Sequence, residues 1–179
     1  MNRSAAIYAS SLYSLAVDEN IAAQILNEMD AVYSIFKSEP EFVMLLASPG
    51  ISKEERTGML DTCLRGKVQP YLLNFLKLIT EREMIRQFGD CCEAYRKLYN
   101  AAMGILPVSV VSAIPLEDGQ ISRLKGKLTK LTGKNVQLCC TVDPKCIGGI
   151  RVDYDDQQID GTVAKRLSSM AELLKNTAF

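Results

Sequence analysis

Hydrophobic residues recur at every third or fourth position through the first hundred residues, which is the period of an amphipathic α-helix. Breaks in this pattern coincide with residues that begin or end helices. Ser52 and Glu55 have the S-x-x-E spacing of a capping box, Pro70 suits a first helical turn, and Gly104 suits a C-terminal cap. The pattern predicts a bundle of six helices over residues 4–17, 21–37, 40–47, 52–64, 70–80 and 84–103.

The pattern changes at Gly104 from a helical period to alternation. Hydrophobic and polar residues alternate, as in half-buried strands, over residues 106–112, 136–142, 150–154 and 157–159. Helical periods return over residues 117–132 and 160–175. The sequence therefore predicts an α+β protein, with an N-terminal six-helix bundle at residues 1–105 and a small C-terminal α/β domain at residues 106–179.

The end of the C-terminal domain supports three local expectations. Gly149, just before the strand at residues 150–154, is expected to adopt a backbone conformation that a Cβ atom would strain. Asp160 is expected to cap the last helix by accepting hydrogen bonds from backbone N–H groups. The spacing of the hydrophobic residues in that helix predicts that one face packs on the sheet; these residues are Val163, Leu167, Met170 and Leu174.

Two of the predicted helices are more hydrophobic than a surface helix requires. The helix at residues 4–17 contains no charged residue, and its polar face consists only of serines. In the helix at residues 70–80, hydrophobic side chains cover an arc of about 160°, although a stripe of about 100° is enough to face a core. Two interpretations remain open: both helices are wrapped by the other four, or they form an apolar groove that accepts an amphipathic helix from a partner.

Composition argues against an enzyme. The chain contains no histidine, which excludes Ser/His/Asp and Cys/His triads and any histidine-ligated metal site. No phosphate-binding glycine motif is present, and Gly148-Gly149 is the only glycine pair. The sequence therefore predicts no catalytic residue, no cofactor and no metal.

Charge argues against a nucleic-acid partner. Basic and acidic residues both number 21, whereas binding to a polyanion needs clustered positive charge. A basic segment does occur in the helix at residues 117–132 and just after it, but no aromatic residue interrupts it to stack on bases. We interpret it as a solvated face, with an acidic protein partner as the alternative; its residues are Arg123, Lys125, Lys127, Lys130 and Lys134.

The six cysteines leave one further alternative open. No C-x-x-C spacing occurs, so a thiolate zinc site lacks its usual arrangement, and adjacent cysteines form disulfides only with strain. The favoured interpretation is reduced thiols that serve as small apolar side chains. A thiol-dependent or metal-dependent regulatory protein is the alternative; the residues concerned are Cys63, Cys91, Cys92, Cys139, Cys140 and Cys146.

Three segments together resemble the delta subunit of F-type ATP synthase, whose mitochondrial counterpart is the oligomycin-sensitivity-conferring protein. The first two correspond to the family's first and fifth helices and read Tyr8-Ala9-x-x-Leu12-Tyr13-x-Leu15-Ala16 and Asn74-Phe75-Leu76-Lys77-Leu78-Ile79-x-Glu81-Arg82. The third is the most specific and reads Ile147-Gly148-Gly149-Ile150-x-Val152, followed by Ile159-Asp160-Gly161-Thr162-x-x-x-Arg166-Leu167. The family usually has serine where this chain has Thr162. The similarity extends over essentially the whole chain.

The resemblance implies a non-catalytic stator subunit that joins the catalytic head of the enzyme to its peripheral stalk. It implies that the helical bundle binds N-terminal segments of the α subunits through its first and fifth helices, the two that are unusually hydrophobic. The candidate contact residues are Tyr8, Ser11, Leu12, Leu15, Leu72, Phe75, Leu76 and Ile79. An adaptor for peptides unrelated to ATP synthase is the alternative from another class.

The resemblance also implies that the C-terminal domain meets the b subunits of the peripheral stalk. It gives the positions of the third segment a structural rather than a chemical role; these are Gly148, Gly149, Asp160, Gly161, Arg166 and Leu167. The protein would then lie on the cytoplasmic side of a bacterial cell membrane and contact that membrane only through the complex.

Overall fold

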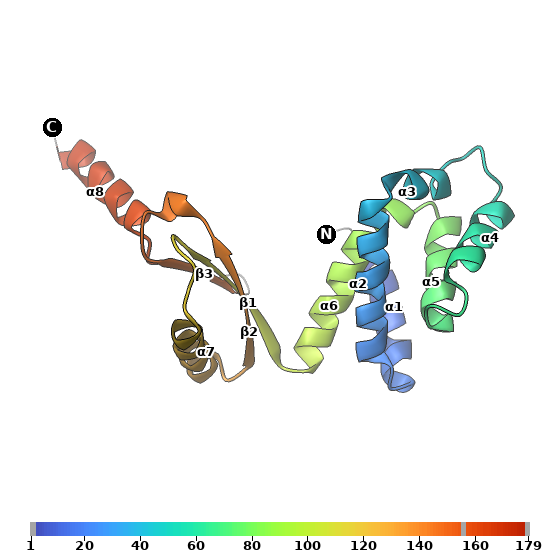
Figure 1. Ribbon diagram of the computed structural model, residues 1–179, viewed down its shortest axis with the longest axis horizontal. Helices are drawn as coiled ribbons and strands as arrows, with labels where there is room; N and C mark the ends of the chain where they lie inside the picture. The colour runs from blue at the N-terminus through green and yellow to red at the C-terminus, as the bar shows by residue number, and fades with distance from the viewer. Residues whose placement is uncertain (1–2, 155–156, 178–179) are drawn as a thin grey trace. The chain divides into compact units, whose positions relative to one another are not determined.

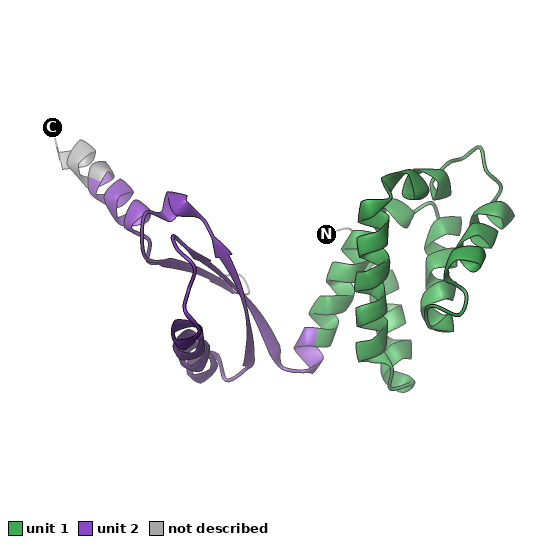
Figure 2. Ribbon diagram, viewed as in Figure 1, with its two compact units in different colours: residues 1–99 green, residues 100–179 purple. Residues whose placement is uncertain are grey.

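The computed structural model describes residues 3–154 and 157–177, and the chain divides into two compact units at residues 1–99 and 100–179 (Figure 2). Unit 1 is helical and unit 2 combines a sheet with helices (Figure 1). The predicted α+β class, with six α-helices first and a sheet domain after them, is confirmed for the described residues.

The helices of unit 1 begin and end close to the predicted positions. They are α1 (Arg3–Asp18), α2 (Ala22–Ser38), α3 (Pro40–Leu46), α4 (Lys53–Leu64), α5 (Pro70–Glu81) and α6 (Phe88–Ala102), the last of which runs across the division between the units. The predicted capping box is present, because the side chain of Ser52 accepts from the backbone N–H of Glu55 and the side chain of Glu55 accepts from that of Ser52.

The helix expected at residues 84–103 is interrupted at its start. A 3₁₀ turn, η1 (Ile85–Gln87), precedes α6, and the chain enters it through Glu83, which has a φ of 60°. Ile85 and Phe88 are both buried. Side chains three residues apart lie on one side of a 3₁₀ turn, so this geometry suits the pair better than an α-helix. Helical periodicity does not distinguish these two kinds of turn.

The core of unit 1 is built around Tyr95 of α6. Its ring packs edge-on against Tyr13 with a centroid distance of 5.4 Å, and its hydroxyl donates to the Ala22 carbonyl at 3.1 Å. The side of α1 that faces this core is made largely of small residues, which let the neighbouring helices approach closely; its buried members are Ala5, Ala9, Leu12 and Ala16.

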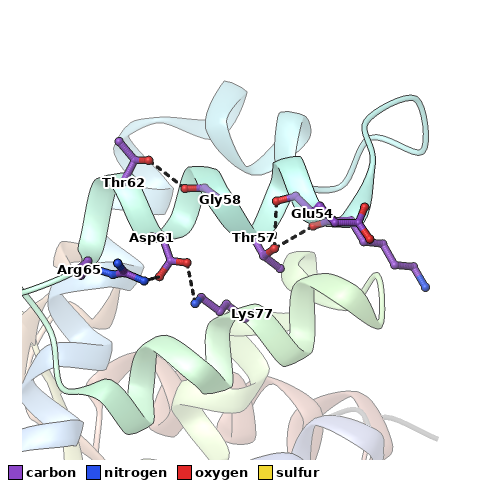
Figure 3. Close-up of polar contacts among 8 residues, drawn as sticks. Glu54, Thr57, Gly58, Asp61, Thr62, Arg65 and Lys77 are labelled. Carbon is purple, nitrogen blue, oxygen red and sulfur yellow. Dashed lines mark hydrogen bonds and ion pairs between the residues drawn. The ribbon is translucent and has the colours of Figure 1, made fainter.

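Helix α4 is joined to α5 by a charged contact. The Asp61 carboxylate lies 2.7 Å from the Lys77 ammonium group and 3.5 Å from the Arg65 guanidinium group, which is on its own helix (Figure 3). The hydrogen bond from Lys77 lowers the pKa of Asp61 below its ordinary value of 3.8, with help from the charge of Arg65. This ion pair links α5 to α4.

Replacing Asp61 with asparagine is expected to reduce the dependence of stability on pH in acid. A carboxyl whose pKa is lowered on folding stabilises the protein fully above its unfolded pKa of about 3.9, and this contribution is lost as the pH falls through the folded pKa. The variant should therefore be less stable than the parent at neutral pH, and the difference should narrow below about pH 4. Urea denaturation followed by circular dichroism at several pH values measures this, with the exposed Glu93→Gln as control. A constant difference at all pH values would contradict the prediction.

Unit 2 contains a mixed sheet with the strand order β2-β1-β3-β4. Strands β1 (Ile105–Ser112) and β2 (Asn135–Val142) are parallel and joined through α7 (Asp118–Thr132), whereas β3 (Ile150–Tyr154) and β4 (Gln157–Asp160) pair antiparallel. One face of the sheet packs against α7 and forms the core of this unit; its buried residues are Leu106, Val108, Val110, Val136, Val152 and, from α7, Leu128.

The glycine motif joins the sheet to the last helix, α8 (Val163–Thr177). Gly149 has a φ of +77°, and a Cβ atom on it would lie 2.4 Å from the Gly161 carbonyl oxygen. Two backbone hydrogen bonds close this contact: Gly161 donates to Ile150 at 3.0 Å and Val163 donates to Gly148 at 2.9 Å. The expectation that Gly149 occupies a position unsuited to a side chain is confirmed.

The cap of α8 differs from the prediction. Asp160 accepts from the backbone N–H of Thr162 at 2.9 Å, which lies before the helix, and this bond lowers the pKa of its carboxyl. Thr162 is the residue that caps α8, since its hydroxyl accepts from the backbone N–H of Lys165 at 3.2 Å. Asp160 therefore orders the turn that precedes the cap.

The prediction that α8 packs on the sheet is wrong for the described residues. Val163, Leu167 and Met170 are 38%, 54% and 60% exposed, Arg166 is also exposed, and Leu174 lies outside the residues whose side chains are described. The hydrogen bond from the Val163 N–H to the Gly148 carbonyl holds the start of α8 beside the turn η2 (Pro144–Cys146). From there the helix leads away from the sheet (Figure 1). The spacing correctly predicts an apolar stripe, but no described part of the chain covers it.

Candidate partner-binding groove

Helices α1 and α5 of unit 1 enclose an apolar hollow of about 240 Å³. Each helix contributes four residues with the spacing i, i+3, i+4, i+7. Residues with this spacing lie on one face of a helix over two turns, and these two faces form the walls of the hollow. The lining residues are Tyr8, Ser11, Leu12 and Leu15 from α1, and Tyr71, Asn74, Phe75 and Leu78 from α5. We call this hollow the α1–α5 groove.

The structure brings five of the eight predicted contact residues together in this groove, and they are Tyr8, Ser11, Leu12, Leu15 and Phe75. The other three, Leu72, Leu76 and Ile79, have no exposed surface and belong to the core of unit 1. These three side chains cannot touch a partner that docks on the folded surface.

Tyr71, Asn74 and Leu78 also line the groove, although they are not among the predicted contact residues. The signal was available in the spacing, because α5 carries two neighbouring stripes rather than one wide arc. Positions 72, 76 and 79 form the buried stripe, while 71, 75 and 78 form the stripe that faces the groove. Hydrophobicity is similar in both stripes, so periodicity alone does not assign either stripe to the core or to the groove.

The groove is mainly hydrophobic, with a few polar groups among its walls. Leu15 and Leu78 are 50% and 39% exposed, which leaves apolar surface in contact with water. The Ser11 hydroxyl donates to the Ile7 carbonyl within α1 at 3.1 Å. A hydrogen bond from the Tyr71 hydroxyl to the Glu19 carboxylate raises the pKa of Tyr71 and places a negative charge near the groove. This arrangement suits the apolar face of a helix and offers no reactive group.

The cysteines of unit 1 do not share one environment, since Cys63 is exposed whereas the other two lie in the core. Cys91 and Cys92 are buried, and burial raises their pKa values to about 11 and about 12, so both thiols are protonated at neutral pH. Cys139 and Cys140 on β2 are exposed.

Among the residues that the structure describes, no three cysteine, aspartate or glutamate side chains are grouped so that they could hold a metal ion. Within the same residues, no helix combines the length and hydrophobicity needed to span a membrane.

The chain is similar to a well-defined set of known proteins. The family model described as "ATP synthase delta (OSCP) subunit" matches residues 5–174. The relatives named "ATP synthase subunit delta" from Alkaliphilus oremlandii and Symbiobacterium thermophilum are 34% and 33% identical to it over 167 residues, which cover 93% of this chain and 93% and 90% of theirs. The relative of the same name from Clostridioides difficile is 32% identical and covers 93% of each chain.

Solved structures support the fold. A chain of the Toxoplasma gondii mitochondrial ATP synthase hexamer superposes with a TM-score of 0.71 at 18% identity, covering 95% of this chain and 96% of the other. A chain from the F1 head and rotor of the Polytomella F-ATP synthase superposes with a TM-score of 0.53 at 17% identity and covers 57% of this chain and 90% of the other.

Proposed function

Because this chain belongs to the ATP synthase delta (OSCP) subunit family, we propose that its α1–α5 groove binds an N-terminal helix of an α subunit and that its unit 2 binds the b subunits of the peripheral stalk. As a member of this family, the chain is a non-catalytic stator subunit of an F-type ATP synthase. It serves ATP synthesis driven by proton transport. Membership of the family decides against the two alternatives, a thiol- or metal-dependent regulatory protein and a peptide-binding adaptor unrelated to ATP synthase.

The observation that supports the groove as the α-subunit site is the matched spacing of its two walls. Both α1 and α5 present the i, i+3, i+4, i+7 pattern, over a length of roughly 10 Å at 1.5 Å per residue. A third helix with the same apolar spacing would complete the packing and cover the exposed parts of Leu15 and Leu78. A basic residue beside the apolar face of that helix would lie near Glu19.

The support for a stalk contact on unit 2 is the uncovered stripe of α8. Val163, Leu167 and Met170 are spaced as one face of a helix and are all exposed. A stripe of this kind packs well against another long helix, and the stalk subunits are expected to supply one. With the α-subunit helix held by unit 1 and the stalk held by unit 2, the protein would keep the catalytic head from turning with the rotor. It would then be a peripheral protein on the cytoplasmic side of the membrane, attached through the complex.

Replacing Leu78 with aspartate is expected to weaken binding of an α-subunit peptide without unfolding the chain. Leu78 lines the groove and is 39% exposed, so an aspartate there is hydrated in the free protein but loses water when the helix docks. We expect the dissociation constant of a synthetic N-terminal α-subunit peptide to rise by about tenfold or more in calorimetry with the full-length chain.

The matched control is Met44→Asp on α3, since Met44 is exposed but lies outside the groove. Circular dichroism should report the same helicity for both variants and the parent. Unchanged peptide affinity in Leu78→Asp, or equal weakening in the control, would place the α-subunit site elsewhere. A scrambled peptide of the same composition tests whether the groove selects the helical pattern or only hydrophobicity.

A further inference from the structure

The two walls of the α1–α5 groove share one sequence pattern. Starting at Tyr8 on α1 and at Tyr71 on α5, each wall has a polar residue at i+3, an apolar residue at i+4 and a leucine at i+7. The corresponding residues are Tyr8 and Tyr71, Ser11 and Asn74, Leu12 and Phe75, and Leu15 and Leu78. The pattern extends beyond the hollow, because both walls have an acidic residue at i+10, Asp18 and Glu81.

The two walls run in opposite directions. Tyr71 lies in the first turn of α5, and its hydroxyl is hydrogen-bonded to the carboxylate of Glu19, which follows the last residue of α1. Tyr8 and Leu78, at the other ends of the two walls, line the same hollow. The same pattern on two antiparallel helices gives the apolar part of the groove approximate two-fold symmetry. A helix with one apolar face would therefore meet similar surfaces whichever way it docked.

Position i+11 breaks this symmetry, since it is Glu19 on α1 and Arg82 on α5. The Glu19 N–H donates to the Leu15 carbonyl at 3.1 Å, and the Arg82 N–H donates to the Leu78 carbonyl at 3.1 Å. These bonds continue the helical turn, so each charged residue follows the groove-facing stripe of its own wall by one turn. Both residues are exposed. Because the walls are antiparallel, Glu19 lies at one end of the groove and Arg82 at the other.

Neighbouring charges preserve the difference between the two ends. At the first end, Asp18 adds a second negative charge to that of Glu19. At the other end, the charges of Glu81 and Arg82 balance. Arg3 in the first turn of α1 and Glu83 after α5 have opposite charges and leave this balance unchanged. The groove is therefore negative at the Glu19 end and neutral, with one exposed guanidinium, at the Arg82 end.

We propose that Glu19 and Arg82 determine the direction in which an amphipathic helix docks in the groove, with a basic residue of that helix at Glu19 and an acidic residue at Arg82. This inference rests on the proposed function, because it concerns the helix that the groove binds. Tyr71 is level with Glu19, so the shared pattern makes Arg82 level with Tyr8. The two charges are then separated by the length of eleven helical residues, roughly 16 Å. Residues eleven apart on the docked helix lie on one face, since they are separated by about three turns.

The end charges act on direction more than on overall affinity. The favoured direction makes two contacts between opposite charges, whereas the reversed direction makes two contacts between like charges. Each contact is exposed and therefore modest in energy. We expect the favoured direction to predominate by about tenfold at low ionic strength, and the preference to decrease as salt screens the charges.

Two synthetic peptides test the direction of docking on the full-length chain. Both have acetylated and amidated termini and the same apolar residues at i, i+3, i+4 and i+7, and they differ only by exchange of a lysine and a glutamate eleven residues apart. A nitroxide at the first residue broadens nearby amide signals in NMR spectra of the chain. Broadening should be strongest near Glu19 and Tyr71 when the lysine is nearer the labelled end, and near Tyr8 and Arg82 when the glutamate is nearer that end.

A chain with both Glu19→Arg and Arg82→Glu exchanges the ends of the groove and keeps the net charge. Each peptide should then dock in the opposite direction. The matched control combines Glu93→Arg with Lys97→Glu on α6, which exchanges two exposed charges outside the groove and should not change the direction. Circular dichroism checks that both chains fold. If the first does not fold, Glu19→Gln should by itself reduce the directional preference.

Docking of both peptides in the same direction, or a direction that the exchange of Glu19 and Arg82 leaves unchanged, would overturn the inference. The groove would then remain a site for a helix, and the proposed function would stand. If neither these peptides nor the N-terminal α-subunit peptide bound in the groove, the proposed function would fail together with the inference.

Discussion

Replacing Gly149 with valine is expected to unfold unit 2 while unit 1 keeps its structure. Two separate effects combine at this position. The φ of +77° disfavours any residue with a Cβ atom, and that atom would lie 2.4 Å from the Gly161 carbonyl oxygen. The backbone N–H groups of Gly161 and Val163, before and after this carbonyl, are hydrogen-bonded to Ile150 and Gly148, so the segment that carries the oxygen has little room to move. We expect unit 2 to lose more than about 4 kcal/mol of stability.

Gly133 provides the matched control within the same unit. It ends α7 with a φ of +69°, but a Cβ atom there would meet no heavy atom within 4 Å. Gly133→Ala therefore isolates the cost of the left-handed backbone, roughly 1–2 kcal/mol, from the steric contact. Gly149→Ala should cost substantially more than Gly133→Ala, although both replace glycine with the same residue.

Hydrogen exchange and partner binding test whether the effect of Gly149→Val is confined to unit 2. Hydrogen exchange should show loss of protection in β1 to β4 and retention in α1 to α5. Pull-down of Gly149→Val should fail with the b subunits and succeed with the α-subunit peptide. Loss of both partners would show that the units do not fold independently, and retention of the b subunits would show that the close contact at Gly161 can be relieved.

Replacing Leu76 with aspartate is expected to unfold unit 1. Leu76 lies two residues before Leu78 on α5 but has no exposed surface, so a carboxylate there would be buried without a partner. We expect a loss of more than about 4 kcal/mol, seen as a large decrease in helical circular dichroism and in Tm. Ile79→Asp should behave in the same way, since Ile79 is equally buried.

The pair Leu76→Asp and Leu78→Asp separates the two stripes of α5. The same change in chemistry should abolish folding at one position and only peptide binding at the other. If Leu76→Asp keeps its helicity and loses only the peptide, the position belongs to the groove and the assignment of the stripes is wrong. If Leu78→Asp unfolds the chain, that residue supports the core rather than a partner.

Helix ends that depend on nearby residues were predicted from the sequence, whereas features that depend on packing against distant parts of the chain were not. The helices at Ser52 and Pro70 begin where their caps predict, because a capping box and a first-turn proline act within one turn. The interruption at η1 was not predictable from periodicity, since it depends on how Ile85 and Phe88 reach the core after the turn at Glu83.

The groove was predictable as a pair of helices but not in its individual residues. The excess of hydrophobic surface on residues 4–17 and 70–80 left two interpretations open, and the structure shows an apolar hollow between the corresponding helices, α1 and α5. Which stripe of α5 faces inward depends on the positions of the other helices, and the sequence of α5 does not contain this information. The same reason applies to α8, whose stripe was correctly recognised and whose neighbour was not.

The double stripe of α5 has a consequence for how the chain tolerates variation. Substitutions at positions 72, 76 and 79 are constrained by folding, whereas those at 71, 74 and 78 are constrained only when a partner occupies the groove. A library of α5 variants screened for abundance of the free chain should therefore be permissive at the second set and restrictive at the first. When the same library is screened for growth that depends on the assembled enzyme, it should be restrictive at both sets of positions. Exchange of the α-subunit gene should then rescue variants only in the second set.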